Sequence, residues 1–146
     1  MPYEIRYEDP IYVVTFLGIV TKADIVRLLA EAPTIEVRDG RAVHRVVDLT
    51  ACSSLEVTGD DIQSFARSRV ERVFPNAFKT AMVAADPIHY GYARMFQIMM
   101  QHGQIVVALF PTVATAKEWL AEPGLELPAV QWEPPTQRRP PQTHAR

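Results

Sequence analysis

The stretch FKTAMVAADPIHYGYARMFQIMMQHGQIVVALF, residues 78–110, places one amphipathic segment between two short apolar runs. The runs AMVAA and IVVALF are continuously apolar, which is typical of strands that are buried on both faces of a parallel sheet. The segment between them opens at Pro87, closes at Gly103 and has the period of a helix. The stretch therefore predicts a strand, a helix and a further strand of a covered sheet.

A similar unit begins the chain. Residues 11–20 are rich in β-branched and aromatic side chains and predict a strand, and residues 21–33 follow it with a helical period. Thr21 and Asp24 can form a capping pair at the start of this helix, and Pro33 is expected to end it. The apolar positions of the helix are Ile25, Leu28, Leu29 and Ala32.

The segment between these two units repeats the pattern. Residues 42–50 predict a strand, and residues 59–74 predict a helix that ends before Pro75. The apolar face of this helix is expected to carry Ile62, Phe65, Ala66, Val70 and Val73. Its arginines are interpreted as a solvated face, with contact to an acidic partner or a phosphate as the less favoured alternative. These arginines are Arg67, Arg69 and Arg72.

The two ends of the folded region complete the architecture. Residues 112–124 predict a last helix, and the alternation of residues 3–8 predicts an edge strand that pairs with residues 11–18 across the turn at 8–10. Together the elements predict an α/β sandwich with a mixed, mostly parallel five-stranded sheet and about four helices.

The composition fits one domain followed by a tail. The chain has 146 residues, 48% of them hydrophobic, which is enough for one core. We assign residues 1–122 to the domain and residues 123–146 to a proline-rich tail, because six of the twelve prolines lie in those last 24 residues. The tail is expected to be disordered from about residue 133. The side chains that could dock its first part are Leu125, Val130 and Trp132.

Charge and cysteine content exclude several classes of function. Lys and Arg number 15 and Asp and Glu 17, so no overall field favours nucleic acid. The start does not resemble a signal peptide, and no apolar run approaches the roughly 20 residues of a membrane helix, so integral membrane association is not expected. The single cysteine, Cys52, suits a reducing compartment, and metal-ligand and nucleotide-binding motifs are missing. We therefore expect a cytoplasmic protein without a metal or cofactor.

The sequences at several strand ends, and at one connection between a strand and a helix, are similar to those of a known family. VVDLT and AMVAAD end two of the expected strands, and LFPTVATAKEWL joins the last strand to the last helix. The most specific positions of the joint are Phe110, Ala116, Trp119 and Leu120. With the order of the elements, these stretches resemble the SpoIIAA-like branch of the STAS and SEC14-like domains over residues 3–121. The resemblance implies a non-catalytic regulatory or ligand-binding domain, often with an apolar cavity and often paired with another protein.

The phosphoacceptor motif of the resembled family is altered in this sequence. In the anti-sigma antagonist branch, an Asp-Ser-Ser-Gly signature carries a phosphorylated first serine, and the matching positions here are residues 56–59, so that Val57 stands at the phosphoacceptor place. The switching mechanism therefore does not transfer as it stands. The alternative modification sites are Thr58, Ser53 and Ser54. For Thr58 we favour a helix cap, because Asp61 follows it at capping-box spacing.

Three further side chains are candidates for a chemical role. Cys52 is interpreted as inert core filler in preference to a nucleophile. Asp86 is favoured as the cap of the helix that follows it, and Asp48 ends a strand at the sheet edge where α/β proteins gather ligands. An acid/base pair of these two carboxylates would require that they lie close together with shifted pKa values.

The methionine-rich helix that opens at Pro87 is the most informative binding candidate. An apolar stripe runs along it from Ile88, and methionine side chains adapt to varied shapes, so a pocket or an interface stands beside the favoured interpretation of core packing. The candidate binding residues on this helix are Tyr92, Met95, Phe96, Met99 and Met100, and on the helix of residues 21–33 they are Leu28 and Leu29.

Two functions follow from these patterns, with an enzyme as the third and least favoured. The leading hypothesis is a regulatory or scaffold module that binds a protein partner or a second copy of the chain. The alternative is a carrier or sensor of a lipid-like apolar small molecule, held in a pocket between the sheet and the helical residues 25–32 and 92–100.

Overall fold

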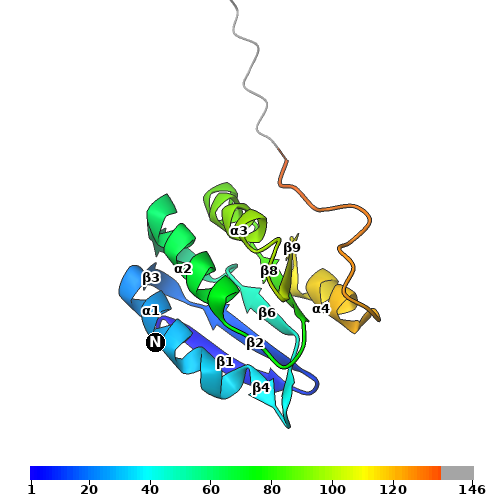
Figure 1. Ribbon diagram of the computed structural model, residues 1–146. Coiled ribbons are helices and arrows are strands. Elements are labelled where there is room, and N and C mark those ends of the chain that lie inside the picture. The colour runs from blue at the N-terminus through cyan, green and yellow to red at the C-terminus, as the bar shows by residue number, and fades with distance from the viewer. Residues whose placement is uncertain (136–146) are drawn as a thin grey trace, which may run out of the picture.

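The computed structural model describes residues 1–135, and five of their strands form one mixed sheet (Figure 1). The spatial order is β1-β2-β6-β8-β9, in which only β1 is antiparallel to its neighbour. The strands are β1 (Tyr3–Glu8), β2 (Ile11–Phe16), β6 (Arg45–Asp48), β8 (Phe78–Val83) and β9 (Ile105–Phe110). The mixed, mostly parallel five-stranded sheet predicted from the sequence is confirmed.

Four helices cover this sheet, three on one face and one on the other (Figure 1). The helices of the first face are α1 (Lys22–Ile35), α2 (Gly59–Glu71) and α3 (Pro87–Met99), and α4 (Val113–Ala121) packs alone on the second. Alternate residues of each strand serve the two faces, so Val46 of β6 packs toward α4 while Val47 packs toward α1 to α3.

The first long strand expected over residues 11–20 is divided. β2 ends at Phe16, and β3 (Gly18–Thr21) leaves the main sheet to pair in parallel with β7 (Cys52–Glu56). The break falls at Gly18, whose φ of 62° lies in the left-handed region that favours glycine. A short hairpin of β4 (Val37–Arg38) and β5 (Arg41–Ala42) follows α1.

The prediction that Pro33 ends the first helix is wrong. α1 continues through the exposed Pro33 to Ile35 and is closed by a hydrogen bond from the Glu36 N–H to the Ala32 carbonyl at 2.9 Å. A proline removes one donor from the ladder, and this loss is confined here to the last turn. The extension places Glu36 at the C-cap, where its side chain turns into the protein.

The predicted apolar face of α2 is correct at its start and wrong at its end. Ile62, Phe65 and Ala66 are buried. Val70 and Val73, however, are 38% and 87% exposed. The helical period carries the buried face from Ala66 to Arg69, which is only 5% exposed, because a partner for its charge lies inside.

The predicted apolar stripe of α3 is correct except at its start, because Tyr92, Met95, Phe96 and Met99 are half-buried and pack against the core. Ile88 is 70% exposed, and the buried residues of the helix are His89, Ala93 and Gln97. Gln97 is tolerated inside because its amide donates to the Val107 carbonyl of β9 at 2.9 Å.

The C-terminal segment up to residue 135 partly docks on the domain. The Trp132 ring packs edge-on against Tyr90 with centroids 5.3 Å apart, and the Tyr90 hydroxyl donates to the Trp132 carbonyl at 3.1 Å. Leu125 and Val130 are 39% and 86% exposed, so the predicted docking holds for Trp132 and not for Val130. The predicted disorder from about residue 133 falls mainly on residues 136–146, outside the described part of the chain.

Candidate ligand cavity

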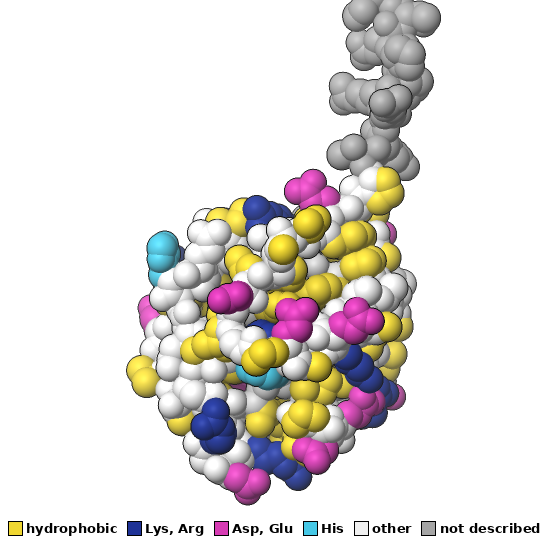
Figure 2. All heavy atoms as spheres, turned by 90° about the vertical axis from the view of Figure 1, so that its right-hand side faces the viewer, with side chains coloured by type: hydrophobic (Ala, Val, Ile, Leu, Met, Phe, Trp, Pro, Cys, Tyr) yellow, Lys and Arg dark blue, Asp and Glu magenta, His cyan; other side chains and the backbone are white. Residues whose placement is uncertain are grey.

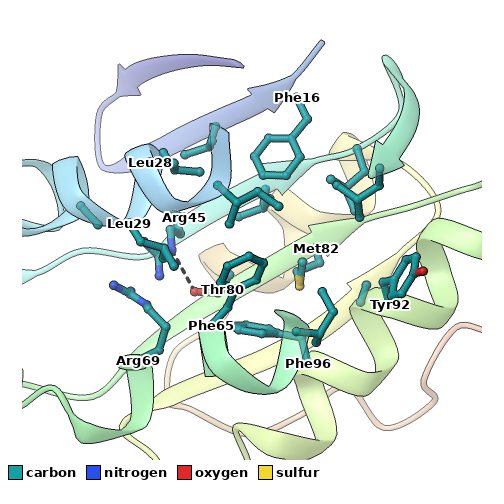
Figure 3. A pocket seen from close by; sticks show the side chains of 18 of the residues that line it. Phe16, Leu28, Leu29, Arg45, Phe65, Arg69, Thr80, Met82, Tyr92 and Phe96 are labelled. Carbon is teal, nitrogen blue, oxygen red and sulfur yellow. Dashed lines mark hydrogen bonds between the residues drawn. The ribbon is translucent and has the colours of Figure 1, made fainter. Parts of the chain in front are cut away.

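A cavity of about 120 Å³ lies between the main sheet and helices α1, α2 and α3 (Figure 3). Its floor is a row of cross-strand neighbours, in which Val14 of β2 pairs with Val47 of β6 and Val47 pairs with Met82 of β8. Phe16 extends the floor along β2. The parallel register thus sets apolar side chains of three strands side by side on the face covered by three helices.

The opposite wall comes from the helices and β7. The residues of this wall are Ile25, Leu28, Leu29, Ala32 and Ile35 of α1, Leu55 of β7, Ile62 and Phe65 of α2, and Tyr92, Ala93 and Phe96 of α3. The Tyr92 hydroxyl is occupied, because it donates to the Val57 carbonyl at 3.0 Å. The cavity is close in size to an engineered apolar cavity of about 150 Å³ that binds benzene.

One end of the cavity is polar. Arg45 of β6 and Thr80 of β8 are cross-strand neighbours. They lie two residues before Val47 and Met82 in their strands and therefore on the same face of the sheet. The Arg45 Nε donates to the Thr80 Oγ1 at 3.2 Å, the bond drawn dashed in Figure 3. Arg69 reaches the same end from α2.

Glu36, which does not line the cavity, binds both of these arginines. Its carboxylate is 2% exposed and accepts hydrogen bonds from Arg45 Nη1 and Arg69 Nη1, both at 2.7 Å, and from Arg69 Nη2. Arg72 Nη1 lies 3.6 Å from the same carboxylate, and the Phe74 ring lies under both Arg69 and Arg72. The expected solvated face is therefore wrong for Arg69 and, in part, for Arg72.

This cluster is electrostatically unusual. Burial alone would raise the pKa of Glu36, but the hydrogen bonds of Arg69 and the charges of the surrounding arginines outweigh that effect and lower the pKa. Burial, followed by repulsion from Arg69, lowers the pKa of Arg45 to about 10. Three arginines thus share one carboxylate, so the cluster keeps an excess of positive charge next to an apolar space.

The structure brings together some of the candidate binding residues and separates others. Leu28, Leu29, Tyr92 and Phe96 line the cavity. Met95, Met99 and Met100 lie outside its lining. Met95 packs near Gly59, Met99 packs half-buried against the core, and Met100 is 1% exposed within the core, so Met100 offers no surface to a partner.

Sequence reasoning missed the polar end of the cavity. Arg69 gave one local signal, because it falls at helical spacing from the buried Ile62 and Ala66. Arg45 and Thr80 gave none, because their role depends on the pairing of β6 with β8 and on Glu36, which is 33 residues from Arg69 in the sequence.

The segment joining β6 to α2 contains no activated nucleophile. The buried Cys52 thiol donates to the Ser54 carbonyl at 3.4 Å, and burial raises the pKa of this thiol, whereas a nucleophilic cysteine needs a lowered one. Thr58 caps α2 as predicted, since its hydroxyl accepts from the Asp61 N–H at 3.2 Å. Ser53 is exposed and Ser54 half-buried, and modification of Ser53, Ser54 or Thr58 stays a prediction.

The aspartates Asp48 and Asp86 have separate local roles. Asp86 caps α3 as predicted, accepting from the N–H groups of Ile88 and His89 at 2.8 and 3.3 Å. Asp48 accepts from the N–H and hydroxyl of Thr50 at 2.9 and 2.7 Å. Over residues 1–135, no three His, Cys, Asp or Glu side chains are arranged to hold a metal ion. In the same part of the chain, every helix is too short or too polar to span a bilayer.

Comparison with known proteins bears on the fold. No protein-family model and no curated protein matches the sequence. Among solved structures, the chain is similar to an uncharacterized protein of the DUF3478 family with a SpoIIAA-like fold from Shewanella loihica PV-4. The sequence identity is 14%, the TM-score is 0.51, and the match covers 81% of this chain and 91% of the other. The chain therefore has a SpoIIAA-like α/β fold, as the resemblance in its sequence implied.

Proposed function

We propose that this domain is a non-catalytic module that binds a small apolar molecule in the cavity between the sheet and helices α1 to α3. The observation that carries the proposal is the cavity itself, about 120 Å³ of space lined almost wholly by aliphatic and aromatic side chains. Ligand pockets in proteins are commonly apolar with a few placed polar groups, and Arg45, Arg69 and Thr80 are such groups here.

The volume limits the size of the ligand. A space of about 120 Å³ accommodates one ring or a short branched chain, by comparison with the benzene-binding cavity of about 150 Å³. A longer lipid-like chain would require α1 or α3 to move away from the sheet. We therefore favour a compact apolar group over an extended acyl chain.

The chemistry of the lining supports binding without catalysis. Among the described lining residues, the polar side chains are Arg45, Arg69, Thr80 and Tyr92. An arginine stays protonated and a lone threonine hydroxyl is a weak nucleophile, so the lining lacks a general base that could act near neutral pH. The least favoured hypothesis, an enzyme, gains no support from this site.

Binding of fluorobenzene to the whole chain, followed by ¹⁹F NMR, tests the proposal. We expect saturable binding that is lost in Leu29→Trp, because the larger side chain fills space at the cavity wall. Val26→Trp on the same helix is the matched control, since Val26 is 51% exposed and does not line the cavity. Absence of saturable binding in the parent chain, or equal binding by both variants, would contradict the proposal.

Binding of a protein partner or a second copy of the chain is the second candidate function. Val70 in the last turn of α2 and Val73, which follows the helix, are exposed, and Val70 lies against Gly103 beyond α3, so apolar side chains face outward there. On the face bearing α4 and the C-terminal segment, acidic and basic side chains are interspersed with apolar ones (Figure 2).

Light scattering with size-exclusion chromatography tests the second candidate for self-association. If two copies pair through Val70 and Val73, we expect a dimer that Val73→Glu converts to monomer. The exposed Val130→Glu is the control, because Val130 lies on the C-terminal segment. A monomer at all concentrations would remove the homodimer from consideration.

A further inference from the structure

The polar end of the cavity limits the chemistry of a ligand more narrowly than its apolar walls do. We propose, on the premise that the cavity binds a small apolar molecule, that this molecule carries a carboxylate, which is received at the end formed by Arg45, Thr80 and Arg69. The ligand class is a compact apolar carboxylic acid, with its ring or branched chain against Val47, Met82 and Phe96.

The first support is the charge balance. Glu36 is the carboxylate within 4.0 Å of Arg45, Arg69 and Arg72 among residues 1–135, so three positive charges face one negative charge. Arg69 and Arg45 are 5% and 13% exposed, which limits the compensation that water can give them. A monoanionic ligand would reduce this excess at the place where it is least hydrated.

The second support is the set of hydrogen-bond donors that remain. Arg45 uses Nε toward Thr80 and Nη1 toward Glu36, which leaves Nη2 to donate to a ligand. The Thr80 oxygen accepts from Arg45, and its hydroxyl hydrogen makes no bond among the described residues. Two neighbouring donors match the two oxygens of a carboxylate.

The third support is preorganisation. Glu36 fixes Arg69 through both terminal guanidinium nitrogens, Nη1 and Nη2, and Arg45 through one, and Phe74 lies under Arg69 with its ring centroid 5.3 Å away. A guanidinium already held in place loses little conformational freedom when an anion binds. A phosphate would bring a second charge and more oxygens than these donors satisfy, so a carboxylate is the better match.

Dissociation constants of three ¹⁹F probes at neutral pH test this inference. The probes are fluorobenzene, 4-fluorobenzoate and its neutral analogue 4-fluorobenzamide. We expect the benzoate to bind at least tenfold more tightly than the benzamide. Thr80→Val, which replaces the hydroxyl with a methyl group, should reduce the preference for benzoate over benzamide several-fold, and Arg45→Gln should abolish it. Arg67→Gln is the charge-matched control, since Arg67 is exposed on α2.

The outcomes separate the inference from the function on which it rests. Binding of fluorobenzene without preference for the benzoate would overturn the carboxylate site and leave the apolar cavity in place. A benzoate preference that persists in both variants would also overturn it. Failure of all three probes to bind would overturn both proposals. If Arg45→Gln does not fold, Thr80→Val alone tests the carboxylate site, and an unchanged preference for the benzoate in Thr80→Val then overturns it.

Discussion

Glu36 connects elements that are distant in the sequence. It sits at the C-cap of α1 and binds Arg45 of β6 and Arg69 of α2, with Arg72 close by. A buried ion pair replaced as a whole can be neutral for stability, but removal of one partner leaves a charge without compensation. Among these four residues, we therefore expect the loss of Glu36 to lower the stability of the fold most.

Glu36→Gln should destabilise the fold by about 3 to 5 kcal/mol, because it leaves the buried Arg45 and Arg69 unpaired. The measurement is the free energy of unfolding from urea denaturation followed by circular dichroism. Glu71→Gln, at an exposed position at the end of α2, is the control and should change stability by less than about 0.5 kcal/mol. Equal effects of the two substitutions would contradict the role assigned to Glu36.

The same carboxylate predicts a pH dependence with a definite sign. The pKa of Glu36 is lowered in the folded state, so its contribution is complete above the ordinary pKa of 4.5 and is lost as the pH falls through the lower folded value. The difference in unfolding free energy between the parent chain and Glu36→Gln should therefore shrink from about pH 5 downward. A difference that stays constant on acidification would be inconsistent with a depressed pKa.

The arginines show where sequence reasoning stops at this scale. The pattern of α2 correctly predicts that Ile62 and Phe65 are buried, but it treats Arg69 as solvated because the burial of a charge depends on a partner. That partner lies at the end of a helix that Pro33 was expected to terminate earlier. A sequence pattern predicts which side of a helix is buried, but it does not identify the residues that pack against that side.

At the scale of elements, local signals locate helix starts well. Thr21 and Thr58 each form a complete capping box, and Asp86 caps α3, all as the sequence predicts. Strand boundaries were less accurate, since the turn at Gly18 separates β2 from β3 and changes the strand's partner from β6 to β7. Such a change depends on long-range pairing and leaves little local signal.

Thr58→Ala should cost about 1 kcal/mol of stability, because it removes the acceptor of the Asp61 N–H at the start of α2. Thr58→Ser keeps the hydroxyl and should retain most of that stability. Both variants are compared by thermal and urea unfolding. If Thr58→Ser is nearly as stable as the parent chain and Thr58→Ala is not, the hydroxyl acts as a helix cap. An unchanged stability of Thr58→Ala would favour a role other than capping, such as modification.

At the scale of the whole molecule, the uneven covering of the sheet creates the cavity. α4 packs tightly on one face through Ala116 and Trp119, whereas three helices from separate parts of the chain meet over the other face (Figure 1). Their side chains leave the space above Val47 and Met82 unfilled. The fold and two of the three helices that line the cavity, α1 and α3, could be predicted from the sequence, whereas the contribution of α2 could not. The volume could not, because it depends on how side chains of four or more elements interlock.

The SpoIIAA-like fold by itself does not assign an activity, since one fold can carry many functions. The functional argument depends instead on an apolar space that ends at a fixed cluster of arginines. A ligand in that space must contact the methyl groups that line it, so these contacts locate the ligand.

Intermolecular nuclear Overhauser effects between bound fluorobenzene and the methyl groups of the whole chain measure this position most directly. We expect contacts to Leu28, Leu29 and Val47, which line the cavity, and none to the exposed Val73. Contacts confined to Val73 and other surface methyl groups, or no contacts at a saturating concentration of fluorobenzene, would contradict the account.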